Sequence, residues 1–445
     1  MSIFGAMNTA ISGLSAQSAS FGNISEDVAN SQTVGFKRVD TDFTNYLTTS
    51  TATQNESGAV IATPDYVNNV QGTITQTDNP LAMAITGQGF FAVSQSTGNA
   101  NGVPTFDPQQ YYTRAGDFTM NAQGYLVNSA GDYLNGWSVN TTTGVVDQNA
   151  LAPIQVSQST YNPVATSSVT LAANLPATPT TGTATASSPL SSQITVYDAL
   201  GTAHTVTLNW TQNSTNNWTV QVSVPDSTTG TTDAGSATVT FGAASGNTAP
   251  EGTIGAVTTT AATQGSITNV SSFASGQPAT LDFTTNFGSG SQTIQLNLGD
   301  YGGTNGVTQY AGSTYSLLGL TQNGVPPGSF SGVTTQDNGN VVVNYNNGQS
   351  RTIAQIPLIT FNAPDSLQSQ NGESFTATTD SGTPLAESVG TNGAGSLVTG
   401  SVEGSNVDIA TEFSNLIVAQ QAYSSNAKVV TTADQMLQAT LSMVT

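Results

Sequence analysis

The sequence predicts a mainly β protein with a terminal α-helical coiled coil. Its architecture is nested and multi-domain, with antiparallel β-sandwich or barrel domains inserted between an N-terminal and a C-terminal helix. Two observations predict this fold class. Both ends of the 445-residue chain carry apolar residues at alternating steps of three and four, the spacing of a helix that packs along a partner. The middle alternates apolar and polar residues between turns rich in Gly and Asn, which is typical of strands with one buried face.

The first predicted element is a helix within residues 1–30. Apart from Ile24, the residues between its apolar positions are small or polar, and no charged side chain precedes Glu26. Such a helix is marginal alone because nucleation is costly and its apolar stripe is narrow, so we expect it to need a partner. The residues of this predicted helix seam are Phe4, Met7, Ile11, Leu14, Phe21 and Val28.

The last predicted element is a helix within residues 406–445. Asp408 and its neighbours supply capping side chains, and neither Gly nor Pro occurs from Ile409 to Val444, so one helix of roughly 54 Å is expected. We predict that the two terminal helices form a coiled coil completed by further copies of the chain. A helical hairpin closing a monomer remains the alternative. The second predicted seam consists of Ile409, Phe413, Leu416, Tyr423, Val430, Leu437 and Leu441.

The residues between the helices divide by composition into three predicted layers. Residues 31–75 and 390–405 read as an extended linker arm with short strands, 76–147 and 331–389 as an inner β domain, and 148–330 as an inserted outer β domain. Within the outer domain, period-two segments predict strands at 194–197, 206–210, 218–224, 237–241, 281–283 and 294–298. Segments 341–345 and 356–361 are predicted to form a hairpin that returns to the inner β domain.

Composition excludes several classes of function. With five Lys and Arg residues against 26 Asp and Glu, the formal net charge is −21, so a nucleic-acid partner is not expected. The chain has no Cys, which excludes disulfides, thiolate catalysis and Cys-ligated metals. Because the N-terminus lacks a basic segment followed by a continuous apolar run, we expect no cleaved signal peptide, and no apolar run is long enough for membrane insertion.

No residues form a convincing catalytic, cofactor or metal site. His204 is the only histidine, and we interpret it as a hairpin partner of Asp198 rather than a catalytic base. Asp282, Asp300 and Asp337 are interpreted as solvated acids. The Asp337–Asn340 segment lacks the downstream Glu of a calcium loop, so a type I′ turn is expected there.

Short motifs at both ends suggest a family. The first spans Asn23 to Arg38, further stretches follow through Trp137, and the last runs from Gly400 to Lys428. These motifs, in this order, resemble the rod and hook family of bacterial flagellar axial proteins, and the stretches 133–137 and 196–201 favour its hook branch. Gln421 departs from the family pattern, in which Arg is usual. The motif residues singled out are Asn30, Gly35, Phe36, Lys37, Asn406, Asp408, Gln420 and Asn426.

The resemblance implies a structural subunit without enzymatic activity. Such subunits polymerise into a flexible curved tube, lined by the terminal helices, that acts as a universal joint between motor and filament. The implied partners are further copies, the rod, the hook-capping and hook–filament junction proteins, and the flagellar type III export apparatus. The implied location is the extracellular hook. Lys37 is then expected in a contact within or between subunits. Arg114 is the sole base of its β module, and we expect it in a salt bridge or carbonyl cap within the β fold, or in a subunit contact.

Three alternatives remain open from the sequence. The nearest is a distal rod protein of the same family, which would assemble into a straight, rigid structure. A secreted acidic β-sandwich enzyme using Asp282 or Asp300 is a second, and a monomeric cell-surface adhesin is a third.

Overall fold

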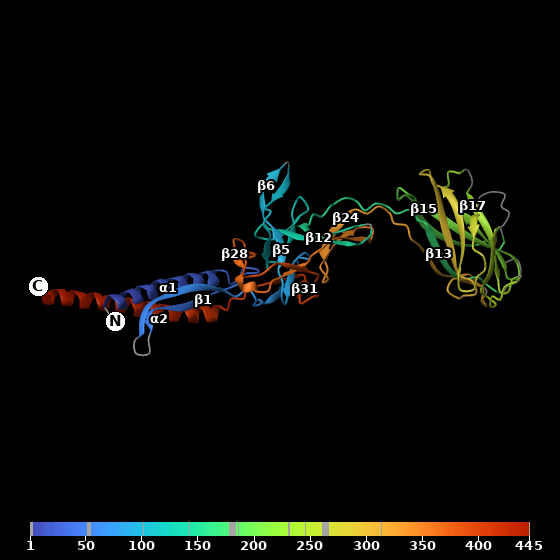
Figure 1. Cartoon of the computed structure of the whole chain (residues 1–445). Coiled ribbons are helices and arrows are strands. Elements are labelled where there is room, and N and C mark those ends of the chain that lie inside the picture. The colour runs from blue at the N-terminus through green and yellow to red at the C-terminus, as the bar shows by residue number, and fades with distance from the viewer. Residues whose placement is uncertain are drawn as a thin grey trace. The chain divides into compact units, whose positions relative to one another are not determined.

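The structure is a computed structural model that describes residues 3–50, 55–100, 102–141, 143–177, 184–185, 187–229, 232–244, 246–259, 267–312 and 314–444. The chain divides into two compact units, whose elements are labelled in Figure 1. Unit 1 comprises Met1–Gln158, Ser331–Asn344 and Ser350–Thr445, and unit 2 comprises Ser159–Phe330 and Tyr345–Gln349. Unit 1 therefore contains both ends of the chain, as the nested order requires.

Two long helices of unit 1, α1 (Ile3–Ala29) and α2 (Ile409–Val444), lie side by side (Figure 1). α2 begins where the sequence predicts, because Asp408 Oδ1 accepts hydrogen bonds from the backbone N–H groups of Ala410 (2.9 Å) and Thr411 (3.3 Å). These donors have no partner inside the helix, so the carboxylate caps it. The predicted pair of terminal helices is confirmed.

A long hairpin, β1 (Val39–Ser50) and β2 (Asn55–Tyr66), packs against α1. Polar side chains of α1 join the two elements: Ser12 Oγ accepts a hydrogen bond from Val60 N at 3.1 Å, and Asn23 Nδ2 donates to Thr41 Oγ1 at 2.9 Å. The sequence predicted an extended arm with short strands here. Instead each strand has twelve residues, because β-branched and aromatic residues favour a continuous pleat and the polar face of α1 supplies partners.

The β region of unit 1 is built around one sheet. Phe90, Tyr112, Phe361 and Phe375 form its aromatic core, with Phe90 edge-to-face against both other phenylalanines. The strands of this sheet are β5 (Phe91–Ser94), β8 (Tyr111–Thr113), β9 (Thr119–Met120), β10 (Leu126–Val127), β11 (Tyr133–Val139), β12 (Val146–Pro153), β24 (Phe330–Thr335), β25 (Asn340–Tyr345), β26 (Ser350–Gln355), β28 (Gln368–Gln370) and β29 (Ser374–Thr376).

Small strand pairs complete this β region and join early to late parts of the chain. β3 (Ile74–Gln76) pairs with β32 (Ser401–Glu403), and β4 (Met83–Thr86) pairs with β31 (Ser396–Thr399). The other pairs are β6 (Ser96–Ala100) with β7 (Val103–Phe106) and β27 (Leu358–Thr360) with β30 (Leu385–Glu387), and a 3₁₀ turn spans Pro364–Ser366.

Two predictions for residues 336–361, the segment that returns from unit 2 to the inner β domain, were wrong. β25 pairs with β26 at 350–355 rather than with 356–361, although β26 does join β11 of the inner region as expected. The turn at Gln336–Gly339 is not type I′, which requires a positive φ at both central residues. Only Gly339 has a positive φ there, 84°, and its N–H donates to Gln336 O at 2.9 Å.

Unit 2 is a β-sandwich. One sheet follows the order β14-β15-β16-β17-β18 and the other β19-β20-β21-β13-β22, with β23 beside β13. Buried residues of both sheets, among them Trp210, Trp218, Leu281 and Leu296, share one core. The strands are β13 (Ser168–Asn174), β14 (Leu190–Tyr197), β15 (Ala203–Ser214), β16 (Asn217–Ser223), β17 (Asp233–Phe241), β18 (Ile254–Thr259), β19 (Ile267–Val270), β20 (Pro278–Asn286), β21 (Ser291–Asp300), β22 (Val307–Thr308) and β23 (Ser316–Gln322).

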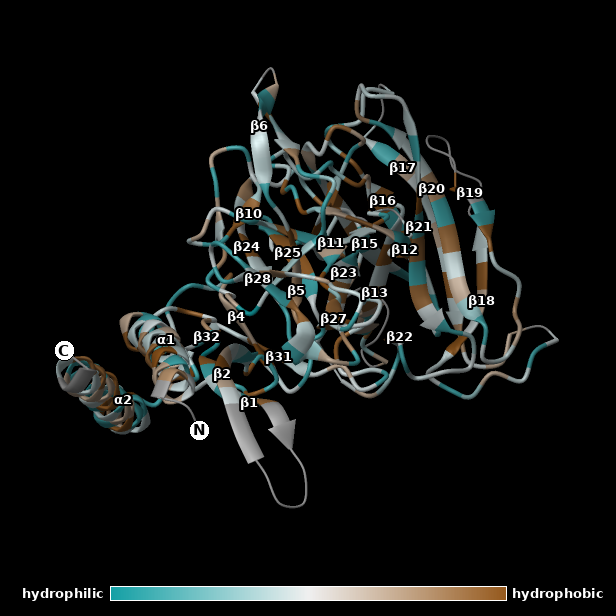
Figure 2. Ribbon diagram, turned by 60° about the vertical axis from the view of Figure 1, so that its left-hand side comes forward, coloured by the Kyte–Doolittle hydropathy of each residue, from teal (hydrophilic) through white to brown (hydrophobic). Residues whose placement is uncertain are grey.

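The six segments predicted as strands in this region each fall on an observed strand, β14 to β17, β20 or β21. Most of the observed strands are longer than predicted, and only the segment 218–224 extends past its strand, by one residue. Along β20 and β21 hydrophilic and hydrophobic residues alternate, as Figure 2 shows by colour. Two pairings differ from the expected antiparallel pattern, because β13 runs parallel to both β21 and β22.

The two ends of unit 2 are tied together by isolated bridges between Tyr161 and Gly328 and between Val164 and Val325. The structure places the start of this unit at Ser159 rather than at 148, because β12 pairs with β11 of unit 1. The unit also takes in the short segment Tyr345–Gln349, which the sequence had placed in the inner domain.

Candidate assembly surface

The buried positions on α1 and α2 are mostly small. Ala10, Gly13 and Ala16 of α1 and Ala419 and Ala433 of α2 are buried. A Cβ on Gly13 would lie only 2.7 Å from Asn426 Nδ2, which shows how closely the two helices approach. A seam built from such residues is narrow, so the larger apolar side chains are left outside it.

The predicted seam residues divide into two groups. Met7, Leu14, Phe21, Val28, Leu416, Val430 and Leu437 are half-buried. The Phe21 and Tyr423 rings meet edge to face with centroids 6.2 Å apart, so part of the stripe does join the helices. Phe4, Ile11, Ile409, Phe413, Tyr423 and Leu441 are exposed, Phe4 by 64% and Leu441 by 68%.

Further exposed apolar residues were missed by the heptad reading. On α2 these include Ile417 and Val418, which are 58% and 67% exposed and lie off the predicted seam. The hairpin β1–β2 contributes further exposed apolar side chains, which the alternation of apolar and polar residues in its sequence could have indicated. We call the whole set the apolar assembly surface: Phe4, Ile11, Phe43, Tyr46, Leu47, Ile61, Ile409, Phe413, Ile417, Val418, Tyr423, Val429, Met436 and Leu441. Extensive exposed apolar surface marks an interaction site.

A buried ion cluster joins the start of the hairpin to the β region of unit 1. The Glu403 carboxylate is fully buried and contacts Lys37 Nζ at 2.6 Å through Oε1 and Arg114 Nη1 at 3.1 Å through Oε2. Lys37 Nζ also donates to Val70 O, and Arg114 Nη2 donates to Gly87 O. Both bases, whose roles the sequence left open, therefore make contacts within the subunit.

The electrostatics of this cluster depend on all three members. Burial lowers the pKa of Lys37 below its ordinary value, and the Glu403 charge opposes that shift. Burial likewise lowers the pKa of Arg114, again opposed by Glu403. One carboxylate thus compensates two buried cations, which is costly to disturb.

Gly35, in the loop between α1 and β1, packs closely against the backbone of Glu403 and Ala115. Its φ is 75°, and its N–H donates to Glu403 O at 2.8 Å. A Cβ at this position would lie 2.4 Å from Ala115 N, so both the backbone conformation and the space require glycine. Phe36 is buried beside it.

The other motif residues mostly make local contacts. Asn406 Oδ1 accepts a hydrogen bond from Arg38 N at 2.8 Å, and its Nδ2 donates to Val67 O at 3.0 Å. Asn30 Oδ1 accepts from Thr33 Oγ1 at 3.3 Å. Asp408 caps α2 as described, Asn426 lies against Gly13, and Gln420 is exposed.

Asp27 is buried between α1 and the hairpin, where its Oδ1 accepts a hydrogen bond from Val39 N at 3.0 Å. Burial raises the pKa of Asp27 to about 7, and the nearby Glu412 carboxylate contributes to the rise. The folded chain therefore binds more protons than the unfolded chain between pH 3.8 and about 7. The stability that Asp27 contributes is present below this window and is lost as pH rises through it.

We therefore expect Asp27→Asn to flatten the pH dependence of stability. At pH 8 the dilute variant should be more stable than the parent chain by on the order of 2 kcal/mol, because no buried charge has to form. At pH 4 the two should differ little. Thermal melts at both pH values measure this, with the exposed Asp78→Asn as the control. Equal gains at both pH values would contradict the assignment.

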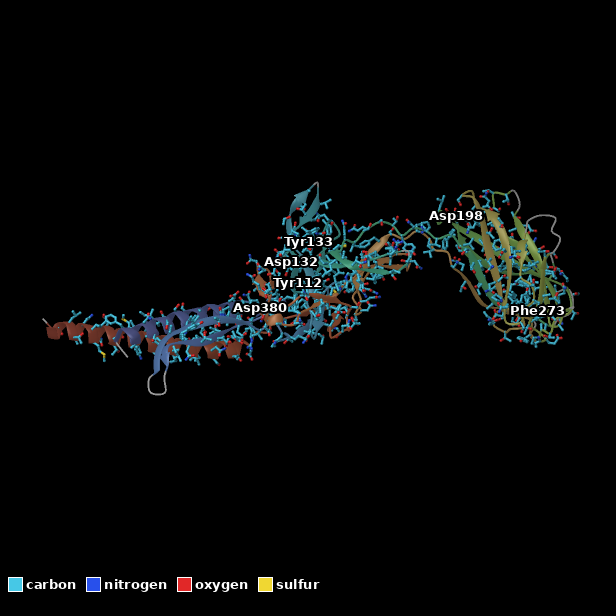
Figure 3. The ribbon with its side chains drawn as sticks, in the orientation of Figure 1. Tyr112, Asp132, Tyr133, Asp198, Phe273 and Asp380 are labelled. Atoms are coloured by element: carbon cyan, nitrogen blue, oxygen red, sulfur yellow. The ribbon has the colours of Figure 1, made fainter. Side chains whose placement is uncertain are left out.

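The residues weighed for catalysis have local roles. His204 Nε2 lies 3.7 Å from Asp198 Oδ2, and the ring stacks on Phe287 at 3.9 Å between centroids. Asp198, labelled in Figure 3, accepts hydrogen bonds from the N–H groups of Leu200 and Thr202. The sequence interpretation paired His204 with Asp198 across a hairpin. The two side chains do lie near each other, but in the strand register His204 is opposite Val196, and no hydrogen bond joins His204 Nε2 to Asp198.

The three candidate acids do not form one site. Asp282 accepts from Gln295 and Asn269, Asp300 from Asn305, and Asp337 from Thr399. In the sheet register Asp300 lies opposite Pro278, about 13 Å along β20 from Asp282. Across the described ranges no cluster of three or more His, Cys, Asp or Glu is placed to hold a metal ion. No helix in the same ranges has both the length and the apolar character needed to cross a membrane.

Comparisons with known proteins place these features in a family. Three family models match in order along the chain: "Flagellar hook protein FlgE/F/G D1 domain" at residues 84–174, "Flagellar basal body protein FlaE D2 domain" at 166–325, and "Flagellar basal body rod FlgEFG protein C-terminal" at 398–443. The flagellar hook protein FlgE of Brucella abortus is 30% identical over 438 residues, which is 98% of each chain. The chain belongs to the flagellar hook protein family.

Another hook protein shows the same extent of similarity. The hook protein FlgE of Escherichia coli K12 is 30% identical over 440 residues, 97% of this chain and 98% of its own. The crystal structure of the Helicobacter pylori hook protein FlgE2 overlaps 73% of this chain and 98% of its own, with a TM-score of 0.46 and 15% identity.

The chain is thus a structural subunit of the bacterial flagellar hook. Hook-family membership implies that it polymerises with copies of itself within the flagellum. The alignments with these hook proteins span nearly the whole of both chains. The alternatives of a distal rod protein, a secreted enzyme and an adhesin are therefore not favoured.

Proposed function

We propose that the chain polymerises through its apolar assembly surface into a curved, flexible tube that acts as a universal joint and transmits motor torque to the filament. The observation that carries this proposal is the exposure of large apolar side chains on α1, α2 and the hairpin. A lone chain leaves these side chains in water, and stacking copies would bury them. Repeated head-to-tail contacts whose rotation does not close produce a helical tube.

The remaining parts of the function follow from the family. We propose that the neighbours of the tube are the rod, the hook-capping protein and the hook–filament junction proteins, and that the chain has no enzymatic activity. Export through the type III apparatus without a cleaved signal is supported by the absence of Cys, since a chain without disulfides can be threaded unfolded.

The double substitution Ile417→Ser and Val418→Ser tests the proposed surface. Because each apolar side chain is worth about 1–2 kcal/mol when buried in an interface, the critical concentration for polymerisation should rise at least about tenfold. Sedimentation of polymer from monomer measures it, while circular dichroism checks that α2 stays helical.

A matched control replaces Val145 and Leu200 with Ser. These side chains are as exposed as the first pair, at 65% and 72%, but lie in the β regions of the two units. The control should assemble like the parent chain. If the two double variants assemble equally well, the apolar assembly surface is not the polymerising surface.

A further inference from the structure

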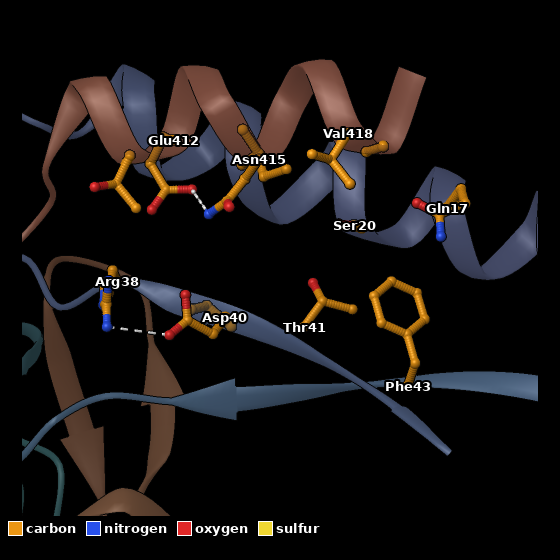
Figure 4. A pocket seen from close by; sticks show the side chains of 13 residues that line it. Gln17, Ser20, Arg38, Asp40, Thr41, Phe43, Glu412, Asn415 and Val418 are labelled. Carbon is orange, nitrogen blue, oxygen red and sulfur yellow. Dashed lines mark hydrogen bonds and ion pairs between the residues drawn. The ribbon is translucent and has the colours of Figure 1, made fainter. Parts of the chain in front are cut away.

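A pocket of about 470 Å³ lies between α1, α2 and β1. Figure 4 shows Glu412 of α2 at one end of it, near Arg38 and Asp40, and Phe43 of β1 towards the other end. Val418 of α2 lines it as well. The pocket is therefore acidic at one end and apolar at the other.

Glu412 is incompletely paired inside this pocket. The residue is only 1% exposed, yet no hydrogen-bond donor in the described part of the chain reaches its Oε1. Its Oε2 accepts one long hydrogen bond, from Asn415 Nδ2 at 3.4 Å. A buried carboxylate oxygen without a donor is unfavourable, so the pocket lacks a donor or a cation.

Four of the five bases of the chain are already engaged. Lys37 and Arg114 contact Glu403, and Arg38 at the pocket contacts Asp40 at 3.2 Å through Nη2. Arg38 Nε is buried without a partner among the described residues, so Arg38 is the competing donor within the chain. Arg351 also has an interaction partner within the chain. The fifth base is Lys428, on α2. It is exposed, and among the described residues no carboxylate or carbonyl oxygen contacts its ammonium group.

Lys428 cannot reach the pocket of its own chain. It lies sixteen positions after Glu412 on one continuous helix, which amounts to about 24 Å along the axis and about 160° around it. Lys428 therefore projects from nearly the opposite side of α2. A contact between these two groups requires two copies of the chain.

We propose that Lys428 of one subunit inserts into the pocket of the next and pairs with Glu412. This inference rests on the proposed self-assembly and names one contact within it. The methylene stem of the lysine matches the apolar end formed by Phe43 and Val418, while the ammonium supplies the missing donor. The contact is head-to-tail, because each copy offers both Lys428 and Glu412, and it recurs along the polymer.

Disulfide crosslinking tests the juxtaposition directly, because the chain contains no native Cys. In the variant Asn415→Cys, Lys428→Cys, the two positions lie about 20 Å apart along one helix, beyond the roughly 7 Å that a disulfide spans. Mild oxidation of the polymer should yield a ladder of covalent oligomers that a reductant removes. The control Asn415→Cys, Gln438→Cys should give no ladder. Polymers that form without a ladder in the test variant overturn the pairing and leave the proposed function intact.

Charge exchange provides a second test. Glu412→Gln and Lys428→Gln should each raise the critical concentration about tenfold or more, and the exchanged chain Glu412→Lys, Lys428→Glu should recover part of the loss. An unchanged critical concentration for Lys428→Gln overturns the pairing. If Lys428→Gln assembles normally and Arg38→Gln does not, the partner of Glu412 is Arg38 instead. The glutamine variant of Glu412 preserves side-chain shape, and the crosslinking test leaves Glu412 unaltered.

Discussion

Replacing Glu403 with alanine is expected to destabilise unit 1 by about 3–5 kcal/mol, because the substitution leaves the buried cations of Lys37 and Arg114 without a counter-charge. It also removes the acceptor for Gly72 N at 2.9 Å. Since Glu403 links the start of the hairpin to the β region, both should loosen together. Urea denaturation of dilute monomer, followed by circular dichroism, measures the loss.

The exposed Glu251→Ala of unit 2 is the matched control and should change stability by less than about 0.5 kcal/mol. A second comparison replaces all three members of the cluster with apolar residues, as in Lys37→Met, Arg114→Met, Glu403→Leu. That variant should be much more stable than Glu403→Ala, because no unpaired charge remains buried. A loss below about 1 kcal/mol in Glu403→Ala would mean that water reaches the two cations.

Deleting residues 1–30 and 406–445 is expected to abolish polymerisation while the rest of the chain stays folded. The hydrophobic cores around Trp210 and around Phe90 contain no residue of either helix, so their burial survives the deletion. The apolar assembly surface loses all its members except those on the hairpin. The critical concentration should therefore rise by more than about a thousandfold.

Sedimentation equilibrium and electron microscopy measure this result. Full-length seeds should not elongate when the shortened chain is added. As a control for the loss of exposed apolar side chains elsewhere in the chain, the full-length variant Val145→Ser, Leu200→Ser should still elongate them. Filaments grown from the shortened chain would locate the assembly contacts in the β regions instead.

The sequence predicted elements well where local chemistry decides them. The limits of α2 follow from the cap at Asp408 and from the absence of Gly and Pro, both of which are visible in the residues themselves. The strands of unit 2 follow from strict alternation, because one face of each is buried in the shared core.

The sequence was less informative where a third element intervenes. The heptad pattern of α1 was read for one partner, but the hairpin also packs on this helix, so the buried positions include Ala10 and Ala16 rather than the larger Ile11. The ion cluster was missed as a unit because positions 37, 114 and 403 meet only through the tertiary fold. Lys37 and Arg114 were each considered singly, and Glu403, although part of the C-terminal motif, was assigned no contact.

The bridges that hold the two ends of unit 2 together have a consequence for how this protein can change. Tyr161 pairs with Gly328 and Val164 with Val325, so the segments that enter and leave unit 2 lie next to each other. A different domain whose own termini are adjacent can replace unit 2 between these two segments without changing the path of the flanking backbone. Unit 2 can therefore be exchanged for another domain, in nature or by design, without altering α1 and α2, the helices that we propose to mediate polymerisation.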